Sequence, residues 1–323
     1  MVWLKLLICA GIIFFAGMKI TRYADVIAEK TGLGKAWIGL VLLATVTSLP
    51  ELANGISAVT FTDIPDLAVG DLLGACMINM LTLALLDIIQ WVRGKPTIFV
   101  KPAKRNVFAC FVSLSLLLFT AFSILMSIYV FDLAIFSVSL YTLIIFAVYF
   151  VSQKVMFHRE HENVEICHEN ANYKLYLKFL LLGLLIIVAG SWLPFIGGEI
   201  ISVMGWGKTF VGVLFLGLAT TLPELVVSIS ALRMGNISMS KGNLFGSNIF
   251  NIGILFVVDV FYRKGPLLAS VSNNMIYAAL FGALLTGVAF RAIKAKTKFR
   301  FAAAAIIVIY IISIYILYGL GMS

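Results

Sequence analysis

Long apolar stretches separated by short polar segments make up almost the whole chain. Each stretch is close to the ~20 residues that a helix needs to cross a bilayer, and none shows the short alternating segments of a transmembrane β-barrel. Because backbone in lipid must satisfy its hydrogen bonds internally, helices are the expected spanning structure. The pattern predicts an all-α membrane protein with ten transmembrane helices, at about residues 3–18, 36–60, 66–90, 107–127, 130–152, 175–203, 209–232, 240–261, 267–289 and 301–320.

The longest polar stretch lies near the middle of the chain, at residues 153–174. It separates five predicted spans in residues 1–152 from five in residues 175–323. We expect it to be a cytoplasmic connecting loop between a first five-helix repeat and a second one.

Composition supports the membrane class. Hydrophobic residues make up 62% of the chain and charged residues 12%, against roughly 45 to 50% and about 25% in soluble domains. The four cysteines are scattered without a CxxC pair, which indicates neither a disulfide framework nor a zinc site. The N-terminal apolar run has no small-residue cleavage site, so it reads as a first span and not as a signal peptide.

The basic residues decide the predicted orientation. The net charge of +9 comes from residues in short loops, which argues for membrane topology and against a nucleic-acid partner. With an extracytoplasmic N-terminus, every Lys and Arg falls on the cytoplasmic side except Lys5, Lys208, Arg263 and Lys264. The rule predicts a multi-pass protein of the cell membrane with both termini extracytoplasmic. Because each half has an odd number of spans, the second half is inverted.

An internal repeat supports this inversion. Residues 39–58 (GLVLLATVTSLPELANGISA) match residues 212–231 (GVLFLGLATTLPELVVSISA), and residues 70–79 (GDLLGACMIN) match residues 242–251 (GNLFGSNIFN). Inverted repeats are typical of secondary transporters, whose ion sites lie near the bilayer midplane between the repeats.

Each repeat carries a proline and a glutamate inside a predicted span. A proline lacks the backbone donor, so Pro50 and Pro223 leave carbonyl oxygens available one turn earlier. A carboxylate in mid-span costs at least ~2.5 kcal/mol, so Glu51 and Glu224 need a cation, a proton or a buried partner. The alternative is a protonated acid that serves only helix packing. The hydroxyl residues beside them are Thr47, Ser48, Thr220 and Thr221.

The following spans add a polar stripe. Residues four apart share one helix face, and two such sets occur: Asp71, Ala75 and Asn79, then Asn243, Ser247 and Asn251. Carboxylate, hydroxyl, amide and carbonyl oxygens form a hard ligand set that suits Ca²⁺ better than metals that prefer His or Cys.

The duplicated Thr-Ser/Thr-Leu-Pro-Glu motif and the duplicated Gly-rich motif resemble the α-repeats of the sodium/calcium exchanger family of calcium/cation antiporters. The resemblance implies a calcium site formed by Glu51, Glu224 and the backbone carbonyls of Thr47 and Thr220. It also implies that the first and sixth spans slide as gates. The implied sodium positions involve Ser48, Thr221, Ser247, Ala44, Gly217, Asn79 and Asn251.

Three departures from the family pattern leave the counter-ion open. Ala75 offers no side-chain oxygen where the family has serine, and Asn251 stands where some sodium-coupled members carry aspartate. Asp71 replaces an asparagine and could take or give a proton, although it could also be a solvated residue at the end of its span.

The predicted function is therefore a secondary active antiporter that exchanges Ca²⁺ for Na⁺ by alternating access. A Ca²⁺/H⁺ exchanger is the alternative, and a cation channel ranks below both. An enzyme is not expected, because all three histidines lie in the polar loop. The transported ions are Ca²⁺ and Na⁺ or H⁺, no cofactor is expected, and the lipid bilayer is the expected partner. The oligomeric state stays open, with a monomer possible.

Four further polar residues in the predicted spans are not expected to bind ions. Asp87 and Asp259 occur late in equivalent spans and are predicted to be interfacial. Ser57 and Ser230 are predicted to be small packing residues. A regulatory metal site in the central loop is a minor hypothesis, based on His158, His161, Cys167 and His168.

Overall fold

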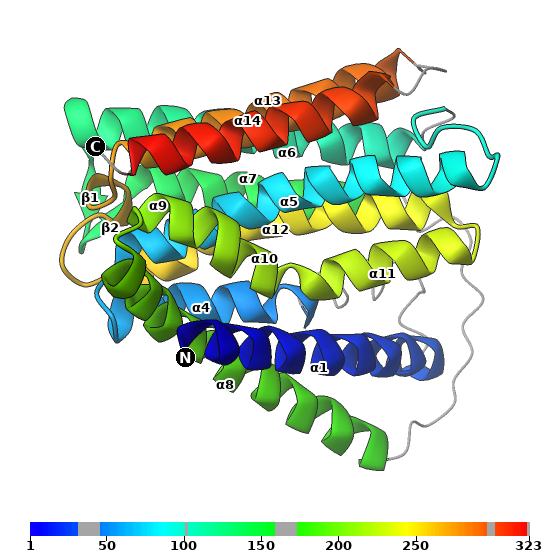
Figure 1. Cartoon of the computed structure of the whole chain (residues 1–323), viewed down its shortest axis with the longest axis horizontal. Helices are drawn as coiled ribbons and strands as arrows, with labels where there is room; N and C mark the ends of the chain where they lie inside the picture. Colours follow the sequence, from blue (N-terminus) through cyan, green and yellow to red (C-terminus); the bar gives the residue numbers. More distant parts are fainter. Residues whose placement is uncertain (32–45, 101–102, 159–172, 296–300, 322–323) are drawn as a thin grey trace.

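The structure is a computed structural model, and it describes residues 1–31, 46–100, 103–158, 173–295 and 301–321. Most helices run along the long axis of one bundle (Figure 1). The long helices are α1 (Val2–Thr31), α5 (Pro65–Val92), α6 (Lys104–Tyr129), α7 (Leu140–His158), α8 (Tyr173–Met204), α12 (Ile237–Phe261), α13 (Asn274–Lys294) and α14 (Phe301–Leu320).

Shorter elements complete the described chain. They are α4 (Leu49–Thr60), α9 (Lys208–Phe210), the π-helix η2 (Val211–Leu216), α10 (Gly217–Thr220), α11 (Leu222–Arg233), the 3-10 helix η3 (Leu267–Ala269), and an antiparallel pair of two-residue strands, β1 (Ala134–Ile135) and β2 (Val138–Ser139).

The all-helical membrane fold agrees with the sequence analysis, but the count of ten spans is not confirmed. Within the described residues, seven helices are long and apolar enough to cross a membrane, or up to eight if the bent segment from Lys208 to Arg233 is one span. The predicted span 36–60 begins outside the described residues, and its described part is the 12-residue α4. The division of the chain at residues 153–174 stays a prediction, because residues 159–172 are not described.

The predicted fifth span, 130–152, is misplaced. Its first residues form the β1–β2 hairpin, and α7 starts only at Leu140. Phe136 and Ser137 have φ values of 49° and 72°, a left-handed turn that no helix accommodates. Hydropathy could not reveal this turn, because the hairpin is almost as apolar as the helix.

Both chain ends lie at the same end of the bundle (Figure 1). Trp3 of α1 and Tyr318 of α14 both contact the ring of Trp206, with ring centroids 5.8 and 6.4 Å apart. An even number of membrane crossings between the termini follows, and eight or ten spans satisfy this equally.

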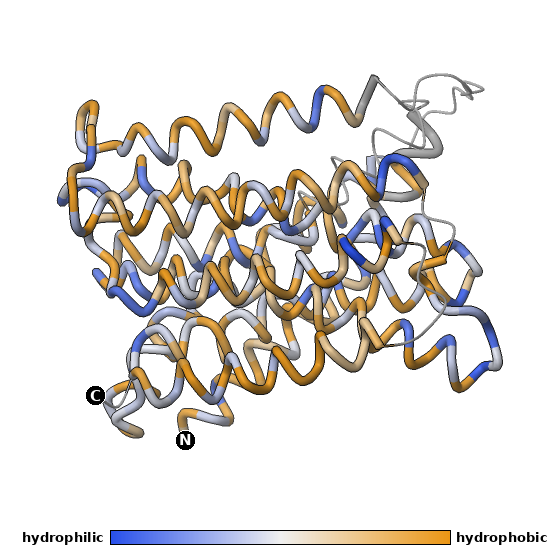
Figure 2. The backbone as a smooth tube through the Cα atoms, turned by 90° about the horizontal axis from the view of Figure 1, so that it is seen from above, coloured by the Kyte–Doolittle hydropathy of each residue, from blue (hydrophilic) through white to orange (hydrophobic). Residues whose placement is uncertain are grey.

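Helices α5 and α12 form the centre of the bundle. Most of each is buried, whereas most of α8 and α14 faces outward. Hydrophilic positions gather mainly near the helix ends, and the middle of the bundle is dominated by hydrophobic ones (Figure 2). Any polar group in the middle of α5 or α12 is therefore shielded from water by several surrounding helices.

Asp87 and Asp259 are fully buried, although an interfacial residue is usually solvated. Asp87, near the end of α5, accepts the backbone N–H of Ile98 at 2.8 Å, and Asp259, near the end of α12, accepts that of Leu267 at 2.7 Å. Each carboxylate fastens the loop that follows its helix. Lys241, which topology assigns to a cytoplasmic loop, is buried in α12 and donates to the carbonyl of Ile98 at 2.8 Å.

Candidate functional site

A broken helix lies at the centre of the second half of the chain. The segment passes from the π-helix η2 through α10 and then bends by 48° into α11. Pro223 stands in the first turn of α11, where its missing N–H leaves no intrahelical bond unmade. Local π-helices are common at functional sites. The break is therefore a candidate position for ligand binding.

The first half shows the matching feature in its described part. Helix α4 begins at Leu49, with Ser48 as its N-cap and Pro50 in its first turn. Glu51 and Glu224 therefore each lie in the first turn of a short helix. The positive end of a helix dipole stabilises negative charge at that position.

The two glutamates are fully buried and only partly hydrogen-bonded. Ser48 Oγ donates to Glu224 Oε1 at 3.1 Å, which joins the start of α4 to the start of α11. The other oxygen of Glu224 and both oxygens of Glu51 have no hydrogen-bond partner. The two carboxylates are close enough to repel each other electrostatically. Such a pair needs a cation or protons between its oxygens.

Asp71 adds a third buried carboxylate from α5. Thr220 Oγ1 donates to Asp71 Oδ1 at 2.9 Å, while Asp71 Oδ2 has no hydrogen-bond partner. Asp71 interacts electrostatically with both glutamates. It therefore lies within the carboxylate cluster and not at a solvated helix end.

The three carboxylates do not form a single tight cage. Among the described residues, no three His, Cys, Asp or Glu side chains are arranged to hold one metal ion. A calcium ion at this place would need hydroxyl or carbonyl oxygens in addition to two carboxylates, which agrees with its usual six to eight oxygen ligands.

Further polar side chains lie buried along α5 and α12. Asn79 Nδ2 donates to Asn248 Oδ1 at 2.9 Å and so joins the two central helices. Asn79 Oδ1, Ser247 Oγ and both amide atoms of Asn251 have no hydrogen-bond partner. The three oxygens among these atoms are buried in the bundle and free to accept a further interaction.

Glycines bring the backbones together beside the cluster. A Cβ atom on Gly74 would lie 2.1 Å from the carbonyl oxygen of Val213, and one on Gly217 would lie 3.0 Å from the carbonyl carbon of Gly74. Helix α5 thus packs directly on the main chain of the broken helix. The Gly217 carbonyl also accepts the hydroxyl of Thr221 at 2.6 Å.

The structure brings together part of the predicted residue set. The residues in mutual contact or electrostatic interaction are Glu51, Glu224, Asp71, Ser48, Thr220 and Thr47. Asn79, Asn251 and Ser247 are buried with unused polar atoms, but their membership of the same site stays a prediction. So do the roles of Thr221 and Gly217 as ligands. Ala44 lies outside the described residues.

Sequence reasoning missed two buried amides. Asn54 is fully buried and lies close enough to the Asp71 carboxyl to act on it as a hydrogen-bond donor, although neither of its amide atoms makes a hydrogen bond of ordinary geometry. Asn248 holds Asn79. A signal for Asn54 existed: it is three residues after Glu51 and replaces the apolar Val227 of the second repeat.

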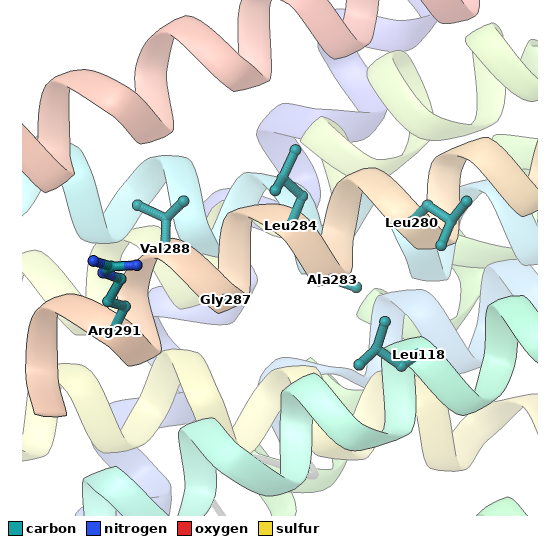
Figure 3. A pocket seen from close by; sticks show the side chains of 7 residues that line it. All are labelled: Leu118, Leu280, Ala283, Leu284, Gly287, Val288 and Arg291. Atoms are coloured by element: carbon teal, nitrogen blue, oxygen red, sulfur yellow. The ribbon is translucent and has the colours of Figure 1, made fainter.

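The apolar groove in Figure 3 is no alternative ion site. It has a volume of about 420 Å³ and lies between α6 and α13. Its lining consists of Leu118, Leu280, Ala283, Leu284, Gly287, Val288 and Arg291. Apolar walls and a basic end offer nothing to a cation.

Comparisons with known proteins agree with these features. The family model described as sodium/calcium exchanger protein matches residues 1–153 and 174–319. An uncharacterized membrane protein of Methanocaldococcus jannaschii is 28% identical over 242 residues, which cover 74% of this chain and 75% of that protein.

Two solved structures share the fold. The crystal structure of the H⁺/Ca²⁺ exchanger CAX superposes with a TM-score of 0.77 at 15% identity, over 99% of this chain and 85% of that one. The sodium-calcium exchanger NCX_Mj, soaked with 10 mM Na⁺ and no Ca²⁺, gives a TM-score of 0.65 at 21% identity, over 98% and 99% of the two chains. At these identities the likeness concerns the fold alone.

Proposed function

The chain belongs to the sodium/calcium exchanger protein family, and from this premise we propose that it is a secondary active antiporter that exchanges Ca²⁺ for Na⁺ across the cell membrane. The observation that carries the proposal is the pair of buried glutamates, one from each repeat, with three oxygens lacking a hydrogen-bond partner. Family members are transporters, so an enzyme activity is not proposed.

The proposed calcium site uses Glu51 and Glu224 together with main-chain oxygens at the two helix breaks. Ca²⁺ offsets the two negative charges and satisfies the unpartnered oxygens. Na⁺ ions compete for the same carboxylates, so the site is filled either by one divalent ion or by several monovalent ions. The predicted sodium ligands are the hydroxyl, amide and backbone groups of Ser48, Thr221, Ser247, Ala44, Gly217, Asn79 and Asn251.

Alternating access follows from electrostatics. An empty cluster leaves buried carboxylates uncompensated, which disfavours a state closed to water on both sides. A loaded cluster removes this cost, so the protein changes its open face only with ions bound. Coupling between the two ion fluxes results without any covalent step.

The proposal includes ten spans in two inverted five-helix repeats, with both termini extracytoplasmic. Support comes from the repeated sequence, from the position of both termini at one end of the bundle (Figure 1), and from the Lys and Arg at the ends of α5, α11 and α13, which lie at the opposite end. The second span of each repeat then includes a short helix that follows a break, α4 in the first repeat and α11 in the second.

Transport in proteoliposomes tests the proposal. We expect an outward Na⁺ gradient to drive ⁴⁵Ca²⁺ uptake, and Glu51→Gln or Glu224→Gln to abolish it. Glu199→Gln is the matched control, because Glu199 lies near the end of α8 and pairs with Lys5 at 2.5 Å. Uptake that does not depend on any imposed ion gradient would instead identify a channel.

Ca²⁺/H⁺ exchange is the second candidate function. Ala75 lacks a ligand oxygen, Asn251 is uncharged, and the H⁺/Ca²⁺ exchanger CAX shares the fold. In the same vesicles a pH gradient without Na⁺ would then drive calcium uptake, and a Na⁺ gradient at equal pH would not.

A further inference from the structure

Among the differences between the two repeats are two positions whose side chains lie close together in space, beside the glutamates. The first repeat has Asn54 and Asp71 where the second has Val227 and Asn243. In the second repeat Asn243 donates to Ser228 Oγ at 3.0 Å and to the Glu224 carbonyl at 3.3 Å, so its amide serves a structural purpose. A carboxylate cannot donate such bonds. Asp71 therefore has a different role from its counterpart.

The surroundings of Asp71 contain unused oxygen ligands. Asp71 Oδ1 accepts the hydroxyl of Thr220 at 2.9 Å, and Asp71 Oδ2 has no hydrogen-bond partner. Asn54 lies close enough to this carboxyl to act on it as a hydrogen-bond donor, but neither of its amide atoms makes a hydrogen bond of ordinary geometry. All three side chains are fully buried. Buried polar atoms are rarely left unpaired. The oxygens of this cluster are therefore available to coordinate a bound ligand.

The charges point to the class of ligand. When ionised, Glu51, Glu224 and Asp71 carry three negative charges, and one Ca²⁺ offsets two of them. Among the described residues, the one buried basic side chain is Lys241, which donates to the carbonyl of Ile98. One further positive charge is needed when calcium is bound. A carboxylate, an amide oxygen and a hydroxyl offer hard oxygen ligands to a small monovalent cation.

We propose that Asp71, Asn54 and Thr220 form a separate site for one Na⁺ ion, which is occupied at the same time as the calcium site at Glu51 and Glu224. This rests on the proposed function, because it takes the two glutamates as the calcium ligands. The arrangement of the carboxylates supports separate sites, since among the described residues no three acidic side chains are placed to hold one ion together.

Simultaneous binding predicts a two-phase effect of sodium. At low concentration Na⁺ fills the Asp71 site and neutralises the Asp71 carboxylate. Because the bound state then has no uncompensated negative charge, Ca²⁺ binding becomes stronger. At high concentration Na⁺ competes at the glutamates and weakens it. A protein without the Asp71 site shows only the second phase.

The experiment measures ⁴⁵Ca²⁺ binding to the purified full chain by flow dialysis, at fixed pH and ionic strength, with N-methyl-D-glucamine replacing Na⁺. We expect low Na⁺ to tighten binding by at least about fivefold, the lower end of usual coupling between sites. Asp71→Asn should give weakening at every Na⁺ concentration. Asn54→Val, which keeps the charge and copies the second repeat, should move the optimum to higher Na⁺. Asp66→Asn is the matched control on α5, since Asp66 accepts the backbone N–H of Ser272, and it should keep both phases.

Several outcomes would overturn the proposal. Purely competitive sodium in the unmodified chain would do so, as would a tightening phase that survives Asp71→Asn. Tightening produced by lower pH in the absence of Na⁺ would assign the position to a proton and not to a metal ion. Failure of the unmodified chain to bind Ca²⁺ at any Na⁺ concentration would refute the calcium site itself, and with it the proposed function.

Discussion

At the scale of single residues, buried acids in this bundle fall into two kinds. Asp87 and Asp259 each accept a backbone N–H of the loop that follows their helix and hold that loop in place. Glu51, Glu224 and Asp71 instead gather at the two helix breaks, where four of their oxygens have no hydrogen-bond partner. The first kind stabilises the fold, because each carboxylate satisfies donors that burial would leave unpaired. The second kind costs stability until an ion arrives, which is the usual condition of a binding site.

Removing the hydroxyl of Ser48 tests the contact between the two helix breaks. In Ser48→Ala, Glu224 loses the hydrogen bond at 3.1 Å that orients its carboxylate. A hydrogen bond to a charged group contributes about 1.5–3 kcal/mol, so calcium affinity should fall by roughly tenfold or more. Isothermal titration with Ca²⁺ measures the change. Ser202→Ala, which removes an exposed hydroxyl on α8, should leave the affinity as it is.

Replacing Asp259 tests the structural kind of acid. The carboxylate accepts Ser139 N at 2.8 Å, Thr142 Oγ1 at 2.5 Å and Leu267 N at 2.7 Å. In Asp259→Asn the amide N–H₂ must face at least one of these donors, which should cost about 1.5–3 kcal/mol. Thermal unfolding in detergent should show a lower midpoint. Asp63→Asn removes only an exposed ion pair with Lys264, so an equal loss in both variants would contradict this role.

At the scale of elements, two helices pack through glycine on the two helix breaks. A Cβ atom on Gly17 of α1 would lie 2.6 Å from Pro223 Cγ, and one on Gly190 of α8 would lie 2.8 Å from the carbonyl oxygen of Pro50. Gly17 and Gly190 are separated by the same 173 positions as the two Leu-Pro-Glu motifs. Each outer helix therefore touches the break of the opposite half.

This contact predicts a specific effect of one methyl group. In Gly17→Ala, α1 must move away from Pro223, which should slow calcium uptake severalfold. Ala favours helix over Gly by about 1 kcal/mol, so a loss would come from the contact and not from the helix. Gly11→Ala is the control on the same helix, because a Cβ there meets nothing within 4 Å. Equal uptake by the two variants, measured with ⁴⁵Ca²⁺ in proteoliposomes, would refute the importance of the contact.

At the scale of the whole molecule, both termini lie at one end of the bundle, and α5, α11 and α13 end at the other (Figure 1), each with Lys or Arg at its C-terminal end. If the basic end is cytoplasmic, Arg93 after α5 faces the cytoplasm and Arg263 after α12 faces outward. Both side chains are exposed, so cysteines at these positions can be labelled.

Cysteine labelling on intact cells checks this orientation. In a chain with Cys167→Ser, the remaining Cys9, Cys76 and Cys110 are buried. An impermeant maleimide should label Arg263→Cys directly and Arg93→Cys only after the membrane is made permeable. The reverse pattern would contradict the predicted topology.

The sequence by itself determined that this is a helical membrane protein, because the length of each apolar segment and the charge beside it are local properties. Each segment inserts into the bilayer according to its own length and flanking charge. It also singled out Glu51 and Glu224 as candidate ligands and the repeated prolines as helix interruptions. A proline and an acid in the middle of a span are unusual wherever they occur. It misplaced α7, because an apolar hairpin and an apolar helix have similar hydropathy.

Only the tertiary structure decided which distant groups meet. The bonds from Ser48 to Glu224 and from Thr220 to Asp71 join residues 176 and 149 positions apart, and no local pattern encodes such pairs. The burial of Asp87, Asp259 and Lys241 was equally invisible, because a polar residue near a span end can face either water or a neighbouring loop. These partners depend on how whole helices pack, which is the level at which an ion site is assembled.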